Sequence, residues 1–116
     1  MLPLRLDKYK ERSPVKKKRP EKLQNVLEVI KECVAKGAYA FSLHFSARST
    51  EREIDVPTTL DVLLTGYEEK KKACFDEQRN SWKYAIRGKT MDDLDIRVVV
   101  AIDNCGMLII TVMHVL

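Results

Sequence analysis

One histidine and two arginines, spaced four residues apart, are the residues of this sequence best suited to chemistry: His44, Arg48 and Arg52. If the segment is helical, residues at i, i+4 and i+8 project from one face. An imidazole transfers protons near neutral pH, and guanidinium groups bind phosphate and stabilise developing negative charge. The pattern is therefore typical of RNA cleavage without a metal. In such cleavage a base activates the 2′-hydroxyl, a cation stabilises the phosphorane and an acid protonates the leaving oxygen.

The same spacing also has a purely structural interpretation. Glu51 and Glu53 stand beside the arginines, and a helix with this pattern often carries only a solvated face of salt bridges. A single histidine at a strand–helix junction is often a capping group rather than a catalyst. The residues alone leave both interpretations open.

Four further groups on the predicted strands could join such a site. Lys83 and Arg87 share one face of a strand, and Arg97 lies near the start of a core strand, where it could point into a cleft between the sheet and the helices. For each of these cations the alternative is ordinary surface charge. His114, the second imidazole, could be a second proton carrier, but we favour an ordinary surface residue because residues at a chain end fray easily.

Two aromatic residues, Trp82 and Tyr84, could stack on bases, but their two-residue spacing favours a place in the core. The sequence has no phosphate-binding loop, no dinucleotide fingerprint, no zinc-protease motif and no acidic pair placed for a metal. The three cysteines are widely spaced and fit neither a disulfide framework nor a C-x-x-C metal pattern. We therefore expect no cofactor, and buried or half-buried free thiols in a reducing cytosol.

The positive charge is concentrated at the N-terminus. Residues 1–22 contain nine Lys or Arg and three acidic residues, whereas residues 23–116 contain twelve basic and fourteen acidic residues. The run Lys16, Lys17, Lys18 and Arg19 lies in a segment with two prolines and few apolar groups. We predict that residues 1–19 form a mobile basic arm that binds phosphates without sequence preference. The alternative is a solubilising tail.

Residues 20–116 are predicted to form a single α+β domain, beginning with helices. Pro20 is suited to a first helical position, apolar residues then recur at three- and four-residue steps, and Gly37 follows, so we predict a helix over 20–36. The stretch from Tyr39 to Phe45 is open to two interpretations, a short strand or a helix capped by Ser42 and running over 43–53. A further helix is predicted over 57–65, ended by Gly66.

From Tyr67 onward the apolar period changes to two, which indicates strands. We predict strands over 67–76, 81–87, 95–102 and 107–115, joined by short turns into a four-stranded antiparallel meander whose apolar face the helices cover. No apolar run is long enough to span a membrane, and the N-terminus has no apolar signal region, so we expect a cytoplasmic protein.

Several short motifs together resemble the family catalogued as domain of unknown function 4258. These are the H-x-x-x-R-x-x-x-R-x-I run, a short helix ending in Thr65-Gly66, a W-x-Y-x-I-x-G strand, an R-V-V-V strand and an I-I-T-V strand. The resemblance covers residues 40–113 and extends in layout to BrnT-like and RelE-like toxins, and more loosely to MqsR. One departure is Glu53, where the family often has glycine; the basic arm and the helix over 20–36 lie outside the shared core.

The resemblance implies a RelE-like fold and the toxin of a type II toxin–antitoxin pair. Such a protein is a metal-independent messenger-RNA interferase, in some cases acting on ribosome-associated mRNA, and is held inactive by an antitoxin. The family pattern would assign His44, Arg48, Arg52 and Arg97 as its polar positions. Two alternatives remain open: a non-catalytic RNA- or protein-binding module with a basic arm, and a degenerate, inactive toxin relative.

Overall fold

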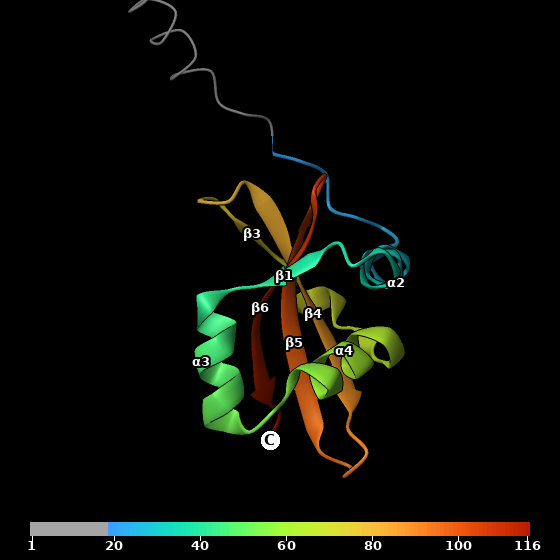
Figure 1. The fold of residues 1–116 in the computed structure, drawn as a ribbon. Coiled ribbons are helices and arrows are strands. Elements are labelled where there is room, and N and C mark those ends of the chain that lie inside the picture. Colours follow the sequence, from blue (N-terminus) through green and yellow to red (C-terminus); the bar gives the residue numbers. More distant parts are fainter. Residues whose placement is uncertain (1–18) are drawn as a thin grey trace, which may run out of the picture.

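The computed structural model describes residues 19–116, so the predicted phosphate-binding residues Lys16, Lys17 and Lys18 lie outside the described residues. The helices are α2 (Val26–Lys36), α3 (Leu43–Arg52) and α4 (Val56–Thr65), with one 3₁₀ turn, η1 (Lys70–Lys72). The strands are β1 (Tyr39–Phe41), β2 (Tyr67–Glu68), β3 (Cys74–Asp76), β4 (Ser81–Lys89), β5 (Asp95–Asp103) and β6 (Gly106–His114). Figure 1 shows the helices arranged around one twisted sheet.

The six strands form a single sheet in the order β1-β6-β5-β4-β2, with β3 also paired to β4. The three long strands β4, β5 and β6 form an antiparallel meander, as predicted, and β1 lies parallel to β6, with Tyr39 opposite Met107. The α+β class is therefore confirmed, whereas the prediction of a four-stranded sheet was wrong. The sheet gains a parallel edge strand because the stretch from Tyr39 to Phe45 forms both of the predicted elements, a strand and then a helix.

The second reason for the extra strands is that the predicted strand over 67–76 is broken. The chain leaves the sheet after Glu68, turns through η1 and pairs again with β4 only from Cys74, which lies opposite Lys83. The intervening residues are charged and lack an alternating apolar face, so nothing favours a continuous strand there. The break leaves Glu69 at the start of the turn, with its backbone N–H donating to the carbonyl of Ala85 at 2.8 Å.

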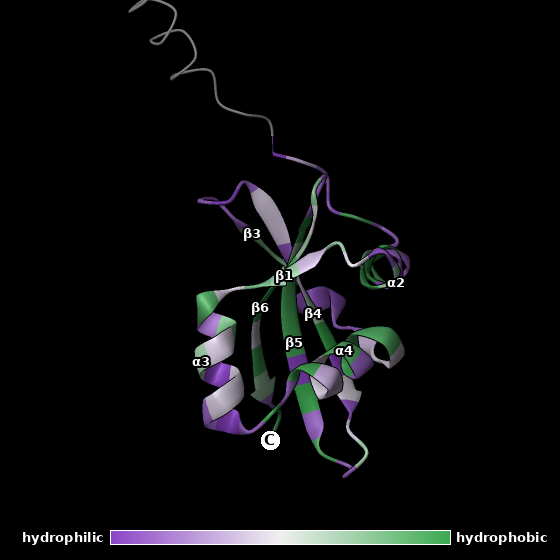
Figure 2. Ribbon diagram, viewed as in Figure 1, coloured by the Kyte–Doolittle hydropathy of each residue, from purple (hydrophilic) through white to green (hydrophobic). Residues whose placement is uncertain are grey.

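The core lies on one face of the sheet. Ile96, Val98 and Val100 of β5 are fully buried and belong to one cluster with Ile30 of α2 and Val62 of α4. Figure 2 shows that the central strands are mostly hydrophobic, whereas α3 is largely hydrophilic beyond its first turn. Because successive side chains of a strand alternate between faces, the odd-numbered residues of β5 lie on the face that α2 and α4 do not cover.

Helix α2 begins later than predicted. It starts at Val26 rather than Pro20, and ends as predicted at Gly37, which adopts the left-handed conformation with φ 69°. The preceding backbone is used instead for contacts with β4: the indole Nε1 of Trp82 donates to the carbonyl of Pro20 at 2.8 Å, and the amide of Leu23 donates to the hydroxyl of Tyr84 at 3.0 Å. These tertiary hydrogen bonds prevail over the helical preference of the local sequence.

Candidate functional site

Helix α3 carries the predicted catalytic stripe, and its start is fixed by Ser42. The Ser42 hydroxyl accepts a hydrogen bond from the backbone N–H of Phe45 at 3.0 Å and donates to the carbonyl of Ile110 on β6 at 2.7 Å. Phe45 itself is 2% exposed and packs against Phe41. One residue therefore caps the helix and ties it to the sheet edge, which confirms the predicted cap.

The three residues of the stripe lie on one face of α3, because the segment is helical as the spacing required. The His44 side chain is exposed and forms no hydrogen bond or ion pair with any residue between 19 and 116. Arg48 retains 36% side-chain exposure and pairs with Glu51 at 3.0 Å. Both groups are accessible to a ligand, since a surface ion pair of this kind contributes little and exchanges readily.

The Arg52 side chain, by contrast, is engaged in a hydrogen bond within the fold. Its Nη1 donates to the carbonyl of Val112 on β6 at 2.6 Å, and the ring Nε2 of His114 lies 3.0 Å from the carbonyl of Arg52. The carbonyl of Val112 is on the stretch of β6 beyond its pairing with β1, where an edge strand needs other hydrogen-bond partners. The two contacts hold the C-terminal end of α3 against β6.

The α3 helix ends in a residue with a strained backbone conformation. Glu53 is the C-cap and has φ 55° and ψ 43°, a left-handed conformation in which a side chain is unfavourable. Glycine occupies such positions without this penalty. Glycine in place of Glu53 would therefore relieve the backbone strain at this turn.

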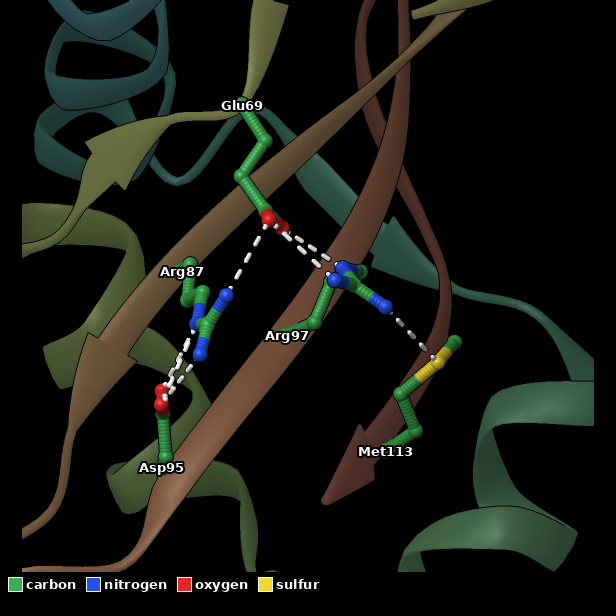
Figure 3. A network of polar contacts seen from close by, with 5 residues as sticks. All are labelled: Glu69, Arg87, Asp95, Arg97 and Met113. Carbon is green, nitrogen blue, oxygen red and sulfur yellow. Dashed lines mark hydrogen bonds and ion pairs between the residues drawn. The ribbon is translucent and has the colours of Figure 1, made fainter. Parts of the chain in front are cut away.

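A second polar cluster lies on the sheet face opposite the core and is drawn in Figure 3. Arg87 of β4 and Arg97 of β5 are directly opposite each other across the two strands. The carboxylate of Glu69 accepts from Arg97 Nε at 2.5 Å and Nη2 at 3.1 Å, and lies 3.5 Å from Arg87 Nη1. Asp95 accepts from Arg87 Nη2 at 2.6 Å and Nε at 3.0 Å. Two like charges are thus held side by side by two carboxylates.

These contacts shift the titration of the groups involved. The hydrogen bond from Arg97 lowers the pKa of the Glu69 carboxyl, and the hydrogen bond from Arg87 lowers the pKa of Asp95. The same bonds raise the pKa of both arginines. The cluster is therefore fully ionised at neutral pH.

The structure does not unite the four predicted catalytic residues. Arg97 lies on the sheet face away from α2 and α4, so the expectation that it points into a cleft between the sheet and the helices was wrong. The reason is strand alternation, since its neighbour Val98 takes the inward position. No hydrogen bond or ion pair within residues 19–116 joins Arg97 to Arg48 or Arg52.

The predicted nucleic-acid-binding residues are also dispersed. Lys83 is half-buried and lies on the same face of β4 as the ion-paired Arg87. Arg19 is exposed, pairs with Glu77 at 2.8 Å and lies over the ring of Phe75 at 4.3 Å from its centroid.

The sequence interpretation missed two residues and misjudged two others. Glu69 and Asp95 were not singled out. A hairpin register that places Arg87 opposite Arg97 brings two positive charges together, and this is a signal that carboxylates are needed nearby. Two of the three cysteines, Cys74 and Cys105, are exposed rather than buried or half-buried.

No helix within residues 19–116 is long and apolar enough to cross a membrane.

Comparison with known families decides the classification. The family model described as Domain of unknown function (DUF4258) matches residues 41–114, from the end of β1 to the end of β6. The chain belongs to this family. The match confirms the family resemblance derived from the motifs, and it includes α3 and both polar clusters, whereas α2 lies outside it. No curated protein matches the chain. Membership of DUF4258 carries no assigned activity.

Proposed function

We propose that this DUF4258 protein is a metal-independent RNA endonuclease, the toxin of a type II toxin–antitoxin pair, with its site on the outer face of α3. The observation that carries the proposal is the pair formed by two groups on α3: an exposed imidazole at His44, which has no hydrogen-bond or ion-pair partner among residues 19–116, and an accessible guanidinium one turn later at Arg48. A general acid–base and a phosphate-binding cation within one helical turn are the two groups that metal-free RNA cleavage needs.

The chemistry uses the ribose itself as nucleophile. His44, in its neutral form, accepts the proton of the 2′-hydroxyl while the 2′-oxygen attacks the adjacent phosphorus. The protonated His44 then returns this proton, directly or through a water molecule, to the departing 5′-oxygen, and the product is a 2′,3′-cyclic phosphate. Arg48 stabilises the negative charge on the phosphorane oxygens by charge-assisted hydrogen bonds.

Arg52 has a positioning role in this proposal rather than a catalytic one. Its bond to Val112, together with the Ser42 hydroxyl bond to Ile110, fixes both ends of α3 on β6. A site on a helix held at two points keeps its geometry better than a site on a loop, which favours catalysis.

Induced expression tests the proposal. Wild-type protein should arrest growth and degrade transcripts into fragments with 2′,3′-cyclic phosphate ends, whereas His44→Ala and Arg48→Ala should do neither. Arg79→Ala is a matched control, because Arg79 also forms a partly exposed ion pair with an acid three residues away, Asp76. It should remain as toxic as the wild type.

Equal growth and intact RNA with all four proteins would remove the enzyme proposal. The antitoxin part is tested separately, by sequencing the region beside this gene and co-expressing any small open reading frame found there. We expect co-expression to restore growth and to give a complex that co-purifies.

A second function is favoured by one specific observation. Two of the four arginines and histidines predicted for catalysis, Arg52 and Arg97, are engaged within the fold. A non-catalytic module that binds RNA or a protein partner requires only surface cations such as Arg48 and Lys83. Binding of RNA that stays intact, with no growth effect on induction, would favour this alternative.

A further inference from the structure

A pocket of about 360 Å³ lies at the end of the sheet remote from the Arg52–His114 contact. Its walls come from the segment before α2, from α2, and from the two turns that join β3 to β4 and β5 to β6. Figure 1 shows the segment before α2 running past the tip of the β5–β6 hairpin. The volume is within the range of small-molecule sites, about 300–1,000 Å³.

The floor and one wall of the pocket are apolar and aromatic. Trp82 and Tyr84, which the sequence interpretation assigned to the core, both line it, together with Leu23 and Ile102. Tyr84 is 1% exposed and belongs to the core, whereas Trp82 is half-buried and packs against the core from its edge. A partly accessible indole is a stacking surface for a flat ring.

The rim of the pocket is polar. Asn80 and Asn104 lie on the two turns, and neither side-chain amide is hydrogen-bonded to any residue of the described chain. Asp103 also lines the rim, where its Oδ1 accepts from the backbone N–H of Cys105 at 2.7 Å and its second oxygen is free of protein donors in residues 19–116. An amide offers both a donor and an acceptor, and a carboxylate offers acceptors only. The rim therefore matches the edge of a base that carries an amino group.

Two cationic side chains lie beside the aromatic residues at this pocket. Lys22 Nζ lies 5.7 Å from the centroid of the Trp82 ring, and Arg19 lies over Phe75, which contacts Trp82 edge-on. In contrast, the described residues that line the pocket include two acids, Glu21 and Asp103, and none of them is a cation. A ligand with a neutral, amino-bearing ring and an anionic tail fits this charge distribution, with the ring inside and the phosphate at Lys22.

We propose that this pocket binds one unpaired nucleobase of the RNA, and that it prefers cytosine to uracil. The amino group of cytosine can donate a hydrogen bond to the Asp103 carboxylate, whereas uracil has at the same position a carbonyl oxygen, an acceptor that the carboxylate repels. The inference rests on the proposed RNA substrate, but binding at the pocket is measurable without cleavage.

Trp82 is the single tryptophan of the chain, so its fluorescence reports on the pocket directly. Cytidine 5′-monophosphate should quench it saturably, and uridine 5′-monophosphate should bind about tenfold more weakly. Asp103→Asn keeps an acceptor for the Cys105 amide and should abolish the preference. Asn104→Ala should raise the Kd for the cytidine nucleotide at least about fivefold. Asn25→Ala, an exposed asparagine without a side-chain capping bond, is the matched control and should leave the Kd unchanged.

The outcomes separate this inference from the proposed function. Saturable quenching that Asp103→Asn and Asn104→Ala alter supports the pocket, whether or not RNA is cleaved. Absence of quenching by the cytidine nucleotide, or equal affinity for both nucleotides, would overturn it even if the protein cleaves RNA.

Discussion

The carboxylate of Glu69 offers a sharp test of how the second cluster stabilises the sheet. We expect Glu69→Gln to destabilise the protein, because it removes the negative charge that lies between Arg87 and Arg97. The amide that replaces one carboxylate oxygen is itself a donor, so it faces guanidinium donors without a partner. Glu68→Gln is the matched control, since Glu68 precedes it in the chain and forms no ion pair within residues 19–116.

The magnitude follows from the burial of the pair. Breaking a fully buried ion pair by removing one partner costs about 3–5 kcal/mol. The side chains of Glu69 and Arg97 retain 12% and 17% exposure, so water screens part of the loss and we expect about 2 kcal/mol. In a domain of this size that corresponds to a fall in Tm of roughly 8–16 °C. The control should change the unfolding free energy by less than about 0.5 kcal/mol.

The pH dependence of the unfolding free energy tests the sign of the Glu69 contribution independently. The folded pKa of Glu69 lies below its ordinary value of 4.5, so its stabilisation is fully present above the unfolded pKa. That stabilisation is lost as the pH falls through the lower folded value. Urea unfolding of both proteins between neutral pH and acid should therefore show the difference between wild type and Glu69→Gln shrinking at acid pH. Equal Tm values at neutral pH, or a difference that grows on acidification, would refute this reasoning.

Four further substitutions test the positions that hold α3 and α4. Glu53→Gly should raise the unfolding free energy by about 0.5–1 kcal/mol in urea denaturation, because it relieves the left-handed strain at the helix end, whereas Glu51→Gly inside the helix should lower it by about 1 kcal/mol. Arg52→Ala should cost about 1–2 kcal/mol and speed amide exchange in α3; unchanged exchange would contradict the clamp on β6. Gly66→Ala should cost about 1–3 kcal/mol, because its Cβ would lie 2.5 Å from the carbonyl oxygen of Arg87; an unchanged Tm would contradict that packing.

Periodic apolar patterns predicted most of the fold. The alternation in 81–87, 95–102 and 107–115 gave three strands whose ends differ from the structure by at most two residues, and the Ser42 cap and Gly37 stop gave correct helix ends. What local pattern could not provide was the pairing of distant segments. Two examples are the parallel pairing of β1 with β6 and the hydrogen bond from the Trp82 indole to the Pro20 carbonyl. Each joins residues that are more than sixty positions apart in the sequence.

The candidate site was predictable in part for the same reason. The i, i+4 spacing of His44, Arg48 and Arg52 needs only a helix, and that helix is present. Whether a guanidinium is accessible depends on its neighbours in space, and the sequence could not reveal that Arg52 bonds to Val112 or that Arg97 bonds to Glu69.

Cleavage of a short RNA by the purified protein in the presence of a chelator tests the central claim most directly. We predict fragments with 2′,3′-cyclic phosphate ends from the wild type and from His114→Ala, whose ring only contacts the Arg52 carbonyl, and intact RNA with His44→Ala. Cleavage by His44→Ala at the wild-type rate, or dependence of cleavage on an added metal, would contradict the account.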